Sequence, residues 1–93
     1  MAILTLSEFE AVIDNLLIRV EKEIVARGSV PPLESARDDL RRLRGATRTP
    51  ARVKDMRAKI EAATTVLGDE IPNDSWVLES MWDVVDYIDY RVS

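Results

Sequence analysis

The stretch SEFEAVIDNLLIRVEKEIVARG, from Ser7 to Gly28, decides the fold class. Its apolar residues recur at steps of three and four, which is the period of one face of a helix. They are Phe9, Val12, Ile13, Leu16, Leu17, Val20 and Ile24. Ser7 and Glu10 have the spacing of a capping box, so we expect the helix to begin at Ser7. Gly28 is expected to end it, since glycine adopts a left-handed backbone without steric cost. This predicts a first helix over residues 7–27.

Proline, glycine and capping residues divide the rest of the chain into three further helical segments. Pro31-Pro32 and Thr49-Pro50 begin two of them, because proline is favoured in the first turn of a helix. The expected helices cover residues 31–44, 50–67 and 75–92. Apolar positions with helical spacing follow in each segment: Leu33, Ala36, Leu40 and Leu43, then Val53, Met56, Ile60, Ala63 and Leu67, then Val77, Leu78, Met81, Trp82, Val84, Val85, Ile88 and Val92.

The fold class that follows is all-α, with residues 1–93 forming a single helical domain. Four amphipathic helices joined by short turns bury all their apolar stripes most simply as an antiparallel four-helix bundle. We expect Gly45 and Gly68 to mark the ends of the second and third helices.

The composition favours a binding protein over an enzyme. The chain contains neither cysteine nor histidine. It therefore lacks thiolate nucleophiles, zinc–thiolate sites, and the side chain most often used as general base or transition-metal ligand. We expect no enzymatic activity, no cofactor and no metal. No signal-peptide pattern and no run of transmembrane length occurs, so the expected location is the cytoplasm, without membrane attachment.

Charge is distributed unevenly behind the net charge of −4. Residues 27–59 hold ten basic and four acidic side chains, whereas residues 69–93 hold seven acidic side chains and only Arg91 as a base. Such separation indicates either that the segments attract each other within the fold or that each attracts a partner. The sequence leaves both interpretations open.

The last helix carries the strongest candidate for a binding surface. At about 100° per residue, six residues fall in one arc opposite the apolar stripe. They are Trp76, Glu79, Asp83, Asp86, Tyr87 and Tyr90. Tyrosine and tryptophan dominate the energetics of interfaces, and the interleaved carboxylates would steer a basic partner toward them. The alternative is a central helix covered on both sides, with its acids facing the basic segment.

We therefore expect a small protein-binding regulator or adaptor, of the inhibitor, chaperone or immunity-protein kind, whose partner is not identified. The runner-up is a nucleic-acid-binding module that uses Arg37, Arg41, Arg44, Arg48 and Arg52, because arginine suits bidentate contact with phosphate. The isoelectric point near 4.8 disfavours this second hypothesis, since duplex-binding domains are usually basic. A homodimer is left open by the breadth of the apolar stripes.

Overall fold

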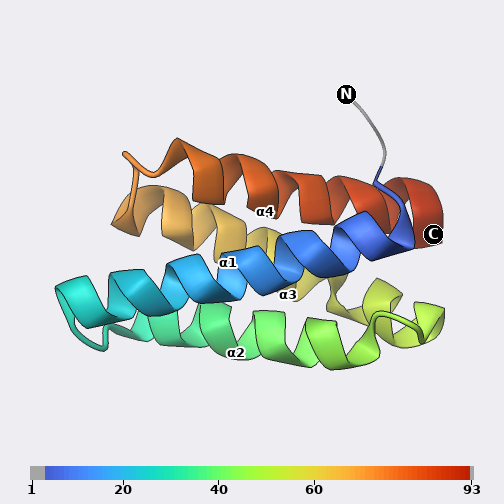
Figure 1. The fold of residues 1–93 in the computed structure, drawn as a ribbon, viewed down its shortest axis with the longest axis horizontal. Helices are drawn as coiled ribbons and strands as arrows, with labels where there is room; N and C mark the ends of the chain where they lie inside the picture. The colour runs from blue at the N-terminus through green and yellow to red at the C-terminus, as the bar shows by residue number, and fades with distance from the viewer. Residues whose placement is uncertain (1–3, 93) are drawn as a thin grey trace.

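The computed structural model describes residues 4–92 and places in them four helices and a terminal π-helical turn. The helices are α1 (Leu6–Arg27), α2 (Pro31–Ala46), α3 (Pro50–Glu70) and α4 (Ser75–Tyr87), and the turn is η1 (Ile88–Val92). Figure 1 shows them side by side, with α2 and α4 at opposite edges of the bundle. Helices α1 and α3 each contact both α2 and α4, whereas α2 and α4 do not contact each other. The predicted all-α helical bundle is confirmed.

One hydrophobic core joins the four stripes. Each helix contributes three or more side chains that are completely covered: Phe9, Ile13, Leu16 and Val20 from α1, Leu33, Ala36, Leu40 and Leu43 from α2, Val53, Ile60 and Leu67 from α3, and Val77, Met81 and Val84 from α4. Burial of these apolar side chains is the main force that holds the helices together. Within residues 4–92 no helix combines the length and the apolar character needed to cross a bilayer.

The start of α1 differs from the prediction. Thr5, not Ser7, is the N-cap: its hydroxyl accepts a hydrogen bond from the Glu8 N–H at 3.2 Å, and Glu8 Oε1 accepts from the Thr5 N–H at 2.9 Å. The capping-box spacing occurs twice here, two residues apart, and Ser7 lies within the first turn. The second box does not form, and Glu10 bonds to other residues of the fold, as described below.

The glycine boundaries are confirmed only in part. Gly28 has a φ of 89°, and its N–H donates to the Ile24 carbonyl at the end of α1, as expected. Gly45 and Gly68 lie inside α2 and α3, so these helices extend beyond the predicted ends to Ala46 and Glu70. Neither glycine has a positive φ. At the end of α3 the Ile71 N–H bonds to the Leu67 carbonyl, so no glycine is needed there.

The last helix is shorter than expected and changes its hydrogen-bond pattern near its end. Its N-cap is Asp74, whose carboxylate accepts from the Val77 N–H at 3.3 Å. At Ile88 the backbone N–H is shared between the carbonyls of Val84 and Val85, and the π-helical turn η1 follows. The residues from Ile88 to Val92, which we expected in the last α-helix, therefore form a π-helical turn.

Candidate functional site

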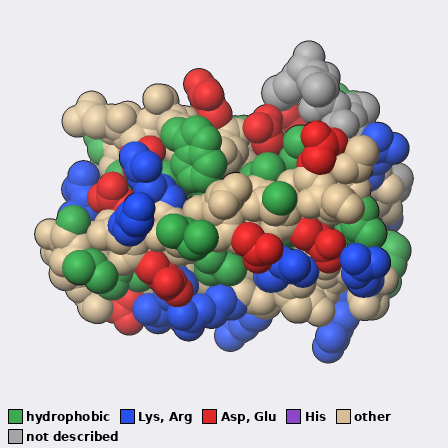
Figure 2. Space-filling model, in the orientation of Figure 1, with side chains coloured by type: hydrophobic (Ala, Val, Ile, Leu, Met, Phe, Trp, Pro, Cys, Tyr) green, Lys and Arg blue, Asp and Glu red, His purple; other side chains and the backbone are tan. Residues whose placement is uncertain are grey.

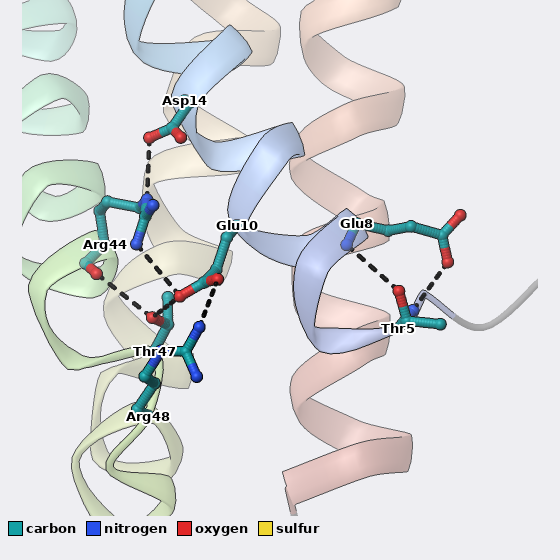
Figure 3. A network of polar contacts seen from close by, with 7 residues as sticks. All are labelled: Thr5, Glu8, Glu10, Asp14, Arg44, Thr47 and Arg48. Carbon is teal, nitrogen blue, oxygen red and sulfur yellow. Dashed lines mark hydrogen bonds and ion pairs between the residues drawn. The ribbon is translucent and has the colours of Figure 1, made fainter.

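The charges where α1 meets α2 neutralise each other within the fold. Figure 3 shows the centre of this arrangement, which we call the α1–α2 charge network: Glu10, Asp14, Arg44, Thr47 and Arg48. Arg44 donates to Asp14 at 2.8 Å and to Glu10 at 3.1 Å. Arg48 donates to the other oxygen of Glu10 at 3.3 Å. Arg44 of α2 and Arg48 of the following turn thus meet the carboxylates of α1.

Glu10 is the hub of the network. Its side chain is only 12% exposed, and the largely buried Thr47 hydroxyl donates to it at 2.7 Å. The Thr47 hydrogen bond, followed by the charges of Arg48 and Arg44, lowers the pKa of Glu10 below its ordinary value. Hydrogen bonding to Asp14 raises the pKa of Arg44 above its ordinary value. Both shifts favour the charged forms that the network requires.

Two further ion pairs use the remaining arginines of α2 that we assigned to nucleic acid. Arg41 bonds to Glu21 of α1 at 2.9 Å, and Arg37 lies 3.3 Å from Asp38. Figure 2 shows acidic side chains next to basic ones along the lower half of this face, where α1 meets α2. Four of the five candidate arginines therefore have carboxylate partners. Arg52 alone among them is exposed without an ion pair in residues 4–92.

Basic side chains without ion pairs gather instead along the groove between α2 and α3. Two hollows of about 410 and 470 Å³ lie in this groove and share Arg42. Lys59 lines the first and Arg52 the second, while Asp39 and Asp55 add one carboxylate to each. The groove has mixed charge, and sequence reasoning did not single it out.

The acids of α4 behave differently from those of α1. Within residues 4–92, no ion pair reaches Glu79, Asp83 or Asp86. Burial, followed by the nearby charges of Asp86 and Glu79, raises the pKa of Asp83 above its ordinary value. The one acid of this segment that pairs with the basic segment is Asp89 in η1, which accepts two hydrogen bonds from Arg57, one of them at 3.1 Å.

The aromatic residues of the last helix are only partly where we expected them. Tyr87 is 8% exposed, and its ring stacks on Phe9 of α1 with the centroids 3.8 Å apart. Its assignment to an exposed binding face is therefore wrong. Trp82, expected in the apolar stripe, is 44% exposed. Trp76 and Tyr90 are exposed, at 44% and 70%.

Both errors have one geometric cause. Since α4 packs only against α1 and α3, its covered arc is shifted toward α1, and it includes Tyr87 but leaves out Trp82. Trp82 follows Glu79 by three residues and precedes Asp86 by four, so it shares their face of the helix. This spacing from Glu79 and Asp86 could have placed Trp82 on the acidic face from the sequence alone. We use the name α4 outer surface for Glu79, Trp82, Asp83 and Asp86 of α4 together with Tyr90 of η1. Trp76 lies at the N-terminal end of this surface.

The fold and the site thus define a small helical bundle with one internally neutralised seam and one helix face that carries unpaired acids and aromatic rings. Comparison with protein-family models, with curated proteins and with solved structures finds no match to this chain.

Proposed function

We propose that this chain is a non-enzymatic, cytoplasmic regulator or adaptor that binds a basic surface of another protein through the α4 outer surface. The observation that carries the proposal is the contrast in charge pairing. Most arginines of the chain form ion pairs with carboxylates that lie outside α4. Within residues 4–92, Glu79, Asp83 and Asp86 form none.

Exposed aromatic rings support the same proposal. Trp82 and Tyr90 lie among the unpaired carboxylates with 44% and 70% of their surface exposed. Aromatic side chains with a polar tip are enriched at protein interfaces and contribute more binding energy than other residue types. Large apolar side chains in such a position gain little within the monomer, so the surface suits a partner that covers them.

The electrostatics of Asp83 indicate the charge of that partner. Partial burial, followed by the charges of Asp86 and Glu79, makes its ionised form less favourable than in water. A lysine or arginine placed over Asp83 and Asp86 would relieve this repulsion. Charge complementarity of this kind mainly accelerates association and selects partners, so binding should weaken as the salt concentration rises.

One observation still supports the nucleic-acid hypothesis: Arg42, Arg52 and Lys59 line the α2–α3 groove and have no ion pair among the described residues. The other candidate arginines would have to exchange carboxylate partners for phosphates. We therefore place this function second.

The test is affinity capture with a matched variant. The wild-type chain and a Trp82→Ala/Tyr90→Ala variant are immobilised side by side and exposed to lysate of the source cells. Bound proteins are identified by mass spectrometry, and bound nucleic acid is measured in the same eluates. We expect at least one protein that the wild type retains and the variant loses, with retention weakened by salt.

Two results would contradict the proposal. The first is an identical set of proteins on both columns. The second is nuclease-sensitive retention that an Arg42→Ala/Arg52→Ala variant abolishes, which would favour the runner-up. Circular dichroism of each variant before capture checks that the loss is not caused by unfolding.

A further inference from the structure

A second group of exposed apolar side chains lies where α1 meets the start of α4. Ile18 and Val25 of α1 are 56% and 86% exposed, and Trp76 of α4 is 44% exposed. Ile18, Lys22 and Trp76 line one hollow of about 290 Å³. A second hollow of about 340 Å³ shares Ile18 and Lys22 and adds Val25. We call Ile18, Lys22, Val25 and Trp76 the α1 stripe.

The stripe is symmetric along α1. Ala11, Ile18 and Val25 are exposed and spaced by seven residues, so they lie on one side of the helix with Ile18 at the centre. Trp76 lies next to Ile18, since both line the same hollow. The apolar centre is thus flanked by equally spaced apolar positions in both directions.

Glu21 and Arg19 also line these hollows, but each is bonded to a residue outside them, Glu21 to Arg41 and Arg19 to Asp74. The charges that remain on the two sides of this centre are opposite. Lys22, one turn beyond Ile18, is exposed and has no ion pair within residues 4–92. Glu79 follows Trp76 by three residues on α4. Because α4 runs antiparallel to α1, as the Arg19–Asp74 and Phe9–Tyr87 contacts require, Glu79 lies on the other side of the centre. At a rise of about 1.5 Å per residue, each charge lies roughly 5 Å along the axis from Ile18.

We infer that a second copy of this chain covers the α1 stripe, in a two-fold symmetric dimer whose axis passes near Ile18. A two-fold axis reverses the direction of the stripe, so Lys22 of each chain meets Glu79 of the other, and Val25 meets Ala11. Ile18 and Trp76 come together at the centre. Such a self-complementary patch closes on itself, which is how most homodimers are built.

Dimerisation is separate from the proposed function, and it is measured by the oligomeric state rather than by partner capture. It uses Trp76 and Glu79 at one end of α4 and leaves Trp82, Asp86 and Tyr90 open to another protein. Variants of those three residues should change partner capture without changing the monomer–dimer equilibrium in solution.

The first experiment measures the molar mass of the full chain by sedimentation equilibrium over a range of concentrations and salt. We expect a monomer–dimer equilibrium that shifts toward monomer as salt rises. Ile18→Asp places two carboxylates at the centre of the interface and should raise the dissociation constant by at least about tenfold. A wild-type chain that stays monomeric at the highest concentration overturns the inference, as does a dimer that Ile18→Asp leaves unchanged.

The second experiment tests the pairing of Lys22 with Glu79 by charge reversal. Lys22→Glu and Glu79→Lys should each weaken the dimer. Each substitution places like charges opposite each other at both symmetry-related contacts. The combined Lys22→Glu/Glu79→Lys chain should recover dimerisation. Lys54→Glu is the control, since Lys54 is an exposed base of α3 with no ion pair in residues 4–92. Failure of the combined variant to recover, or equal weakening by Lys54→Glu, overturns the inferred geometry.

Discussion

The α1–α2 charge network and the α4 outer surface both contain three or more charged side chains, yet only the first satisfies them within the chain. In the network, Glu10 accepts from Arg44, Arg48 and Thr47. On α4, Asp83 faces Asp86 and Glu79, which are charges of its own sign. The difference teaches that charge separation along a sequence does not by itself identify a binding surface. We propose the α4 outer surface because its carboxylates form no ion pair within residues 4–92.

The comparison predicts opposite effects of pH in the two regions. The lowered pKa of Glu10 means that its contribution to stability is present above the ordinary glutamate range and is lost as pH falls through the folded-state value. Asp83, whose pKa is raised, makes a destabilising contribution at neutral pH that disappears as pH falls. A fall in pH therefore weakens the α1–α2 charge network, and it removes the unfavourable charge of Asp83 on the α4 outer surface.

The two tyrosines of the last helix give the largest expected contrast. Tyr87→Ala removes a buried ring that stacks on Phe9, so it should cost about 3–5 kcal/mol of unfolding free energy. Tyr90→Ala changes an exposed side chain and should stay within about 0.5 kcal/mol. Urea denaturation followed by circular dichroism measures both. Equal losses in the two variants would show that Tyr90 is covered and would remove it from the α4 outer surface.

The hydroxyl of Thr47 sharpens the comparison on the side of the network. Thr47→Val keeps the shape but removes the donor to Glu10, and we expect a loss of about 1 kcal/mol. Thr49→Val is the matched control, because Thr49 is exposed and makes no capping hydrogen bond with its side chain. The same denaturation measurement applies. A loss in the control as large as in Thr47→Val would mean that β-branching near the turn, not the network, causes the effect.

The corrected N-cap gives a third pair of variants. Thr5→Ala should cost about 1 kcal/mol, the usual value for loss of a capping side chain. Ser7→Ala, in the exposed first turn, should stay within about 0.5 kcal/mol. Thermal melts of both variants decide between the two capping boxes that the sequence offers. A larger loss for Ser7→Ala would restore the boundary that we first expected.

Much of the fold could be predicted from the sequence because the apolar period and the proline positions are local signals. The position of Gly28 at the end of α1 is another such signal. The errors concern features that depend on neighbouring helices. Thr5 and Ser7 both offer a capping-box spacing; the structure uses Thr5, while Glu10 bonds to side chains distant in the chain. Tyr87 and Trp82 lie at the two margins of the apolar arc of α4, where only the placement of α1 and α3 determines which ring is covered.

The sequence predicted which segment carries the candidate site and its residue types, but not all of the residues that belong to it. The separation of charges pointed to α4, and Glu79, Asp83, Asp86, Trp76 and Tyr90 are at least partly exposed. The sequence could not show which acids the basic segment would use. Arg44 and Arg48 take their partners from α1, which lies far from them in the chain, and Arg57 takes Asp89 from the end of the acidic segment.

The smallest expected effect is also the most specific to the α4 outer surface. Asp83→Asn removes a carboxylate whose ionised form is disfavoured by burial and by Asp86 and Glu79, so the variant should be slightly more stable at pH 7, by less than about 0.5 kcal/mol. The sign follows from the raised pKa: the folded chain binds a proton more readily than the unfolded chain, so ionisation at neutral pH opposes folding. The gain should shrink as pH falls through the range where Asp83 takes up its proton, because wild type and variant are then both neutral at this position. Denaturation midpoints of the two chains at pH 7 and pH 4, each at low and high salt, measure the trend. A variant that is less stable than the wild type at pH 7 would show that Asp83 has a cationic partner within the fold, and the α4 outer surface would then resemble the α1–α2 charge network rather than contrast with it.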